Sequence, residues 1–176
     1  MHIQYVKSRL QKWFSFPQNK LYCQVSTTSH QGPHIRTMDL YDITEEGQLI
    51  FLTDTSTRKW MDLQEFPNMA VCLLNLDHVQ IIVEGSAMLK TSMSDPHTVS
   101  IYWNNFLDQY WKDYYLSRPL NLKPNLNEIP SSFGLIVMTP NLWEILEINK
   151  EDFLKSSRKQ FRLRDGVWVS HDLAPA

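Results

Sequence analysis

The feature that most constrains this chain is a series of short segments in which apolar and polar residues alternate, separated by turn residues. Between positions 20 and 28, Leu21, Cys23 and Val25 alternate with Tyr22 and Gln24. A period of two is typical of a strand with one buried face. Segments of strand character recur at 34–41, 48–53, 69–76, 79–91, 133–140, 142–149, 161–164 and 167–170. Short turns between successive strands favour antiparallel pairing.

Three segments have helical spacing instead. One covers 3–14 and ends before Pro17, and a second covers 54–66, where Thr55 or Ser56 can act as the N-cap. A third, longer helix is expected to begin at Ser94. Its apolar stripe comprises Val99, Trp103, Phe106, Leu107, Tyr110 and Tyr114.

About eight or nine strands and three helices predict a β-rich α+β fold. The chain of 176 residues is long enough for one domain with a real core, and no repeat or linker divides it, so a single domain over 1–176 is expected. Closing the sheet into a barrel removes its exposed edges. Periodicity alone does not distinguish a barrel from a sandwich.

Charge and cysteine content limit the classes of function. Lys and Arg total 17 against 19 Asp and Glu, a net charge of −2, which argues against a nucleic-acid or anionic-membrane binder. Cys23 and Cys72 lie in apolar runs and are expected to be buried thiols in a reducing compartment, although a disulfide stays open. With no signal-peptide pattern, membrane-length apolar run or metal-ligand spacing, we expect a cytoplasmic protein without a metal site.

One stretch carries a candidate binding site. Arg36 lies in a predicted strand, and the helix after the next strand opens with Thr57, Arg58 and Lys59. Helix N-termini attract anions, and converging cations with a threonine hydroxyl suit a phosphate monoester. In the alternative, which the residues alone slightly favour, Arg58 and Lys59 are solvated and Arg36 pairs with a carboxylate.

Four motifs in order resemble the pyridoxamine 5′-phosphate oxidase family. That family has an arginine on one strand, a Phe-Tyr-Thr strand end and a Ser-Arg-Lys turn. Here these positions hold Arg36, Phe51-Leu52-Thr53 and Thr57-Arg58-Lys59. Residues 80–85, QIIVEG, are similar to the family's glutamine-bearing strand, and residues 161–175, FRLRDGVWVSHDLAP, are similar to its closing hairpin.

The resemblance implies a split β-barrel that forms a homodimer, with FMN in clefts at the subunit interface. Arg36, Arg58 and Lys59 would hold the phosphate, while strand backbone and Gln80 would face the isoalloxazine. Carried over by position, the FMN-binding residues are Arg36, Thr37, Met38, Leu52, Thr53, Thr57, Arg58, Lys59 and Gln80.

The match to the family is incomplete. Tyr41 replaces a lysine and Ile82 replaces an arginine. Tyr114 and Arg118 could hold a second phosphate in a substrate, or they could simply complete the helix stripe and lie at the surface. After them, 117–130 is expected to be a long loop. Arg158 is a cation near the family's substrate arginines but not in the same position.

These departures point to an oxidase-related FMN-binding protein rather than the vitamin B6 enzyme itself. The first hypothesis for function is an FMN-dependent oxidoreductase that acts on a small-molecule donor, with catalytic residues unknown. The second is a carrier or sensor that binds FMN, or haem, on the same fold without turnover. The third is a dimeric barrel that binds no cofactor.

Overall fold

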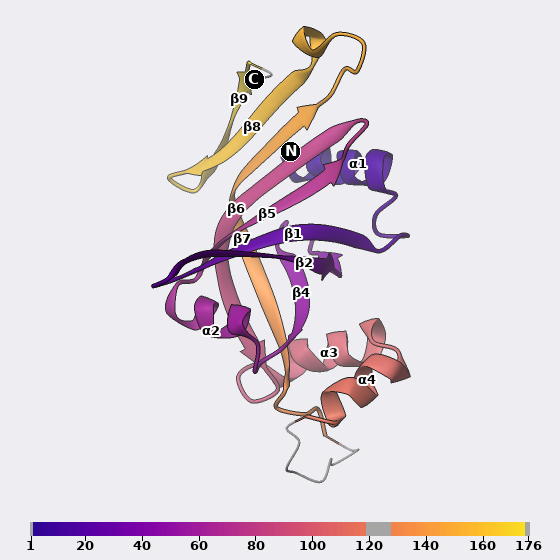
Figure 1. Ribbon diagram of the computed structural model, residues 1–176, viewed down its shortest axis with the longest axis vertical. Helices are drawn as coiled ribbons and strands as arrows, with labels where there is room; N and C mark the ends of the chain where they lie inside the picture. The colour runs from indigo at the N-terminus through magenta and orange to yellow at the C-terminus, as the bar shows by residue number, and fades with distance from the viewer. Residues whose placement is uncertain (1, 119–127, 175–176) are drawn as a thin grey trace.

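The computed structural model describes residues 2–118 and 128–174 and shows one curled antiparallel sheet (Figure 1). The strand order is β2-β1-β5-β6-β7-β4-β3, with β8 added to β7 and β9 to β8. The predicted antiparallel β-rich fold is therefore confirmed. The strands are β1 (Leu21–Ser29), β2 (Gly32–Leu40), β3 (Asp42–Ile43), β4 (Leu49–Asp54), β5 (Asn68–Asn75), β6 (Val79–Thr91), β7 (Phe133–Glu147), β8 (Ser157–Arg164) and β9 (Val167–Leu173).

The helices differ from the prediction in number. They are α1 (His2–Phe14), α2 (Arg58–Glu65), α3 (Pro96–Phe106) and α4 (Gln109–Leu116), with a 3₁₀ turn η1 (Phe153–Lys155). The predicted long third helix was wrong because Asp108 interrupts it and caps α4, accepting a hydrogen bond from Trp111 N at 3.1 Å. Asp95, not Ser94, caps α3. Tyr110, expected in the apolar stripe, is 74% exposed.

The two strands predicted at 133–140 and 142–149 form one strand, β7, which ends at Glu147. Gly85 pairs with Pro140 and Glu84 with Leu142, which leaves Asn141 as an extra residue in a bulge. A Cβ atom at Gly85 would lie 2.2 Å from the Thr139 carbonyl oxygen, so this close approach requires glycine. The proline is tolerated at this irregularity in the ladder.

The bulge also keeps the apolar side chains of β7 on the correct face. Before it, Ile136 and Met138 point into the main core, and after it Trp143 and Ile145 do so. The alternation changes from even to odd positions because one extra residue reverses the face that each side chain meets. A long strand can therefore direct apolar side chains into one barrel interior along its whole length.

Two cores lie on opposite sides of β4 and β7. The main core fills the curl of the sheet, and the curl brings β2 into contact with β4. The second core packs α3 and α4 against the other face, where Trp103 and Tyr115 meet Phe133. Strand β4 is buried along its entire length because it faces both cores.

Several smaller expectations can be compared with the part of the chain that is described. Asp165 and Gly166 both have positive φ in the predicted β8–β9 turn. Cys23 is buried and Cys72 half-buried, both as free thiols. No described helix is long and apolar enough to cross a membrane. Most of the predicted loop at 117–130 lies outside the described residues, which stop at 118 and resume at 128.

Candidate functional site

The start of α2 presents an uncapped helix terminus. Its N-cap is Thr57, rather than the predicted Thr55 or Ser56, and Thr57 makes no side-chain capping hydrogen bond. Its hydroxyl instead donates to the Asp54 carbonyl oxygen at 2.7 Å. The first turn contains no acidic residue. The positive end of the helix dipole therefore has no carboxylate of its own first turn to offset it.

Three cations converge at this terminus. Burial and then the charge of Arg58 lower the pKa of Arg36, although Asp62 opposes the shift. Burial and then the charge of Arg36 lower the pKa of Lys59, although Asp54 opposes that shift. Arg36 therefore lies within electrostatic range of both Arg58 and Lys59. The structure thus brings together the residues predicted to hold a phosphate.

Asp62, a buried carboxylate on α2, supports one side of the cluster. Its Oδ2 atom accepts hydrogen bonds from Thr27 Oγ1 at 2.6 Å and His34 Nδ1 at 2.9 Å, and lies 3.7 Å from Arg36 Nη2. Burial alone would raise the pKa of Asp62, but the hydrogen bonds from Thr27 and His34 and the charge of Arg36 together lower it. Arg36 therefore has the carboxylate partner that the alternative interpretation expected.

Asp54, a second buried carboxylate, lies on the other side of the cation cluster. Its Oδ1 atom accepts hydrogen bonds from Ser56 N and Oγ at 2.8 and 2.7 Å. Its Oδ2 atom lies 3.4 Å from the Tyr114 hydroxyl and 3.7 Å from Arg118 Nε, and the Arg118 guanidinium lies 4.9 Å from the Tyr114 ring centroid. Tyr114 and Arg118, predicted to bind substrate, therefore lie beside the predicted phosphate site in the same chain.

The remaining predicted contacts on β2 and β4 differ in what they can offer. The side chains of Met38, Leu52 and Thr53 are buried, so a ligand could meet these residues only through their backbone. Thr37 is exposed, and its hydroxyl donates to Gln24 Oε1 at 3.2 Å. This arrangement agrees with a role for strand backbone, and not for these side chains, in meeting a planar ring.

Gln80 is separated from the cluster within one chain. Arg36 lies on the same face of β2 as Met38, which packs in the main core. On β6, Val79 and Ile81 face that core, so Gln80 between them points to the outer face of the sheet. Within one chain the Arg36 and Gln80 side chains therefore point to opposite faces of the sheet.

Arg158, the third predicted substrate residue, lies apart on β8. Its Nε and Nη2 atoms donate to Glu144 Oε1 at 2.9 and 2.7 Å, and Gln160 donates to Glu144 Oε2 at 3.1 Å. Tyr41, which replaces the family's lysine, is half-buried, and burial raises its pKa to about 12. It is therefore a neutral phenol at physiological pH.

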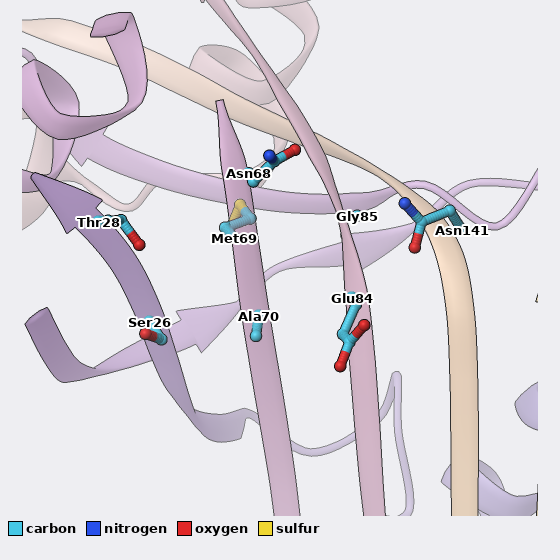
Figure 2. Close-up of a pocket in the computed structure, with 8 residues that line it drawn as sticks. All are labelled: Ser26, Thr28, Asn68, Met69, Ala70, Glu84, Gly85 and Asn141. Carbon is cyan, nitrogen blue, oxygen red and sulfur yellow. The ribbon is translucent and has the colours of Figure 1, made fainter. Parts of the chain in front are cut away.

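A hollow of about 380 Å³ opens on the outer face of β1, β5, β6 and β7, as Figure 2 shows. It is lined by Ser26, Thr28, Asn68, Met69, Ala70, Glu84, Gly85 and Asn141. Glu84 contributes a carboxylate and no lining residue is a cation. Because this lining would repel a phosphate, the cation cluster at α2 is the better candidate for an anionic cofactor.

Comparison with solved structures defines the fold. A pyridoxamine 5′-phosphate oxidase-related, FMN-binding protein from Nostoc punctiforme PCC 73102 superposes with a TM-score of 0.77 at 22% identity, covering 98% of this chain and 96% of that chain. The chain has the split-barrel fold of these oxidase-related proteins. The family resemblance expected from the motifs is confirmed at the level of fold.

Two further split barrels extend the comparison. PhzG from Burkholderia lata 383, in complex with tetrahydrophenazine-1-carboxylic acid, gives a TM-score of 0.73 at 18% identity, covering 98% of this chain and 92% of that chain. General Stress Protein 26 from Bacillus anthracis gives 0.55 at 25% identity, covering 82% and 94%. No family model and no curated protein matches the sequence.

Sequence reasoning missed the two carboxylates that organise this part of the split barrel. Asp62 lies beside Leu63 on the buried face of α2. A charged residue on such a face is seldom buried without a partner, which is the signal that was available. Asp54 is the last residue of the buried strand β4, and it gives a similar signal.

Proposed function

We propose that this chain binds FMN, with the phosphate at the start of α2. The observation that supports this most strongly is the charge balance. Arg36 and Arg118 contact the buried carboxylates of Asp62 and Asp54, and Arg58 and Lys59 add two further cations, which leaves two positive charges in excess. A phosphate monoester carries about −1.5 to −2 charges at pH 7 and would neutralise that excess. A relative in fold from Nostoc punctiforme is described as FMN-binding.

A homodimer follows from the same proposal. Arg36 and Gln80 lie on opposite faces of the sheet, so a flavin that meets both would lie between two copies. The outer face also carries exposed apolar side chains at Tyr22 (61%), Ile35 (73%) and Leu74 (47%). Burying these side chains against a second copy would be favourable. The free thiols of Cys23 and Cys72 agree with a cytoplasmic location for the dimer.

The chemistry would be that of an oxidoreductase acting on a small-molecule donor. Bound FMN supplies hydride and electron transfer, and the protein supplies binding, orientation and electrostatics. In this chain the cations fix the phosphate, strand backbone near Leu52 and Thr53 meets the ring system, and Tyr114 with Arg118 lies beside the site. None of these roles requires the chain to provide an acid or a base.

Binding without turnover is the second candidate, and the charge pairing supports it. Both arginines predicted to anchor an anionic substrate already contact carboxylates, Arg118 with Asp54 and Arg158 with Glu144. A paired guanidinium attracts a substrate anion less strongly. On this hypothesis the barrel carries FMN, or haem in its place, and no donor reduces it efficiently.

Titration of FMN into the apo-protein tests the proposal, with flavin fluorescence and thermal stability as readouts. We expect saturable binding, and Arg58→Ala should weaken it about tenfold or more, because a charged hydrogen bond contributes about 1.5–3 kcal/mol. Arg164→Ala, at an exposed arginine in the β8–β9 hairpin, is the matched control. Absence of binding at tens of micromolar FMN would reject the FMN site and leave haem as the next ligand to test.

Steady-state reduction separates the two candidates once FMN is bound. Bleaching of the flavin absorbance by NADH, NADPH or an amine donor would identify an oxidoreductase. A loaded protein that none of these donors reduces would support the carrier hypothesis.

A further inference from the structure

Asp62 is placed where it can control the geometry of the cation cluster. Three side chains meet a single atom, Oδ2: Thr27 from β1 and His34 from β2 donate hydrogen bonds to it, and Arg36 from β2 forms an ion pair with it at 3.7 Å. The carboxylate is 5% exposed. It therefore ties the helix that begins with Arg58 and Lys59 to the strand that carries Arg36.

We propose that Asp62 is a positioning residue for the anion site, which acts by holding the Arg36 guanidinium in place. This inference rests on the proposed FMN site. The guanidinium lies 3.7 Å from the Asp62 carboxylate on one side, and its Nη1 atom donates to the Val25 carbonyl oxygen at 3.3 Å. Arginine has five N–H donors, so these two contacts leave others for a phosphate.

Two physical effects of Asp62 on anion binding have opposite signs. As a negative charge near the site it weakens the attraction for phosphate, so its removal would tighten binding. As a fixed partner it spares Arg36 the entropy that a free side chain loses on binding, about 0.5–1.5 kcal/mol for each immobilised side chain. We infer that the second effect is larger, because the Asp62 carboxylate is itself buried and lies 3.7 Å from the Arg36 guanidinium.

The test compares Asp62→Asn with Glu65→Gln by measuring dissociation constants for FMN and for riboflavin. Both substitutions remove one carboxylate from α2, but Glu65 is exposed and contacts His30. We expect Asp62→Asn to weaken FMN roughly three- to tenfold and to leave riboflavin binding unchanged. Glu65→Gln should leave FMN affinity unchanged or slightly tighter. If Asp62→Asn tightens FMN, or weakens both ligands equally, the inference is wrong.

A double-mutant cycle tests whether Asp62 acts through Arg36. In an Arg36→Ala background, Asp62→Asn should cause no further loss of FMN affinity, because the group it positions has been removed. An equal loss in both backgrounds would overturn the inference. If Asp62→Asn does not fold, Thr27→Val removes one hydrogen bond to Oδ2 and should weaken FMN in the same direction by a smaller factor.

The outcomes separate this inference from the proposed function. Wild-type protein that binds FMN, and loses affinity on Arg58→Ala, supports the site whatever Asp62→Asn does. If that variant then binds FMN as wild type does, only the role of Asp62 is rejected. Wild-type protein that binds no FMN rejects both.

Discussion

Two parts of this molecule pair arginine with a buried carboxylate, and they do so differently. On β7 and β8, Arg158 and Gln160 satisfy both oxygens of Glu144 at distances of 2.7–3.1 Å. At the start of α2, Arg36 and Arg118 each lie 3.7 Å from their carboxylates, and cations are in excess. A closed pair such as that of Arg158 and Glu144 stabilises the sheet and leaves few hydrogen-bonding groups for a ligand. An open cluster keeps donors and charge for an anion.

The largest expected effect comes from breaking the ion pair between Arg158 and Glu144. Glu144→Ala leaves Arg158, whose side chain is 33% exposed, without its carboxylate. Loss of one partner of a buried pair costs about 3–5 kcal/mol, and partial exposure reduces this to about 2–3 kcal/mol here. Urea denaturation measures the change. Glu147→Ala removes a carboxylate that is 23% exposed, against 10% for Glu144, so it should cost less, and equal costs would contradict the dependence on burial of the carboxylate.

Removing one cation from the cluster at α2 should change the stability of the apo-protein and its FMN affinity in opposite directions. Lys59→Met removes a half-buried charge that Arg36 repels. We expect the apo-protein to become more stable by about 0.5–1 kcal/mol, while FMN affinity falls about tenfold. Thermal unfolding of the apo-protein and an FMN titration measure the two effects. A variant that is both less stable and unchanged in FMN affinity would contradict an open cluster.

Acid pH should weaken the network around Asp62. The folded-state pKa of Asp62 is lowered, so its contribution to stability is complete above its unfolded pKa of about 3.9 and is lost as the pH falls below that value and through the lower folded-state pKa. The stability difference between wild type and Asp62→Asn should therefore shrink as the pH is lowered from about 5 to about 2. Urea midpoints measured across that range give the result. A constant difference would show that the carboxylate charge does not matter.

The smallest effect is expected in the outer hairpin. Lys159 contacts Asp172 at 3.5 Å, and the Asp172 side chain is 85% exposed. Surface ion pairs contribute about 0–1 kcal/mol, so Asp172→Asn should change the free energy of unfolding by less than about 0.5 kcal/mol. A loss as large as that of Glu144→Ala would remove the contrast between exposed and buried pairs.

Local pattern explains how much of the fold was predictable. Strand β6 begins at Val79 and ends at Thr91, as the alternation indicated. The break between α3 and α4 was missed because aromatic residues at helical spacing stand on both sides of Leu107 and Asp108, and the Asp108 cap outweighs that spacing. The continuity of β7 was missed because Pro140 normally ends a strand, and only pairing with Gly85 shows that it lies at a bulge.

The cations of the cluster at α2 could be picked out from the sequence, but its carboxylates could not. Arg58 and Lys59 stand together in the sequence, and the motif order placed Arg36 near them. Asp62 acts on Arg36 across 26 positions of chain, through the contact of a helix with a strand. No local pattern encodes that contact. The opposite orientations of Arg36 and Gln80 likewise become visible only when the strands are placed in one sheet.

The most direct test of the central claim compares FMN with riboflavin, which differ by the phosphate alone. Dissociation constants for both ligands should be measured in wild-type protein and in Arg58→Ala. The account predicts that wild type prefers FMN by at least about tenfold, and that Arg58→Ala loses most of this preference while riboflavin affinity stays constant. Equal affinities of wild type for the two ligands would show that the cluster at α2 does not bind the phosphate.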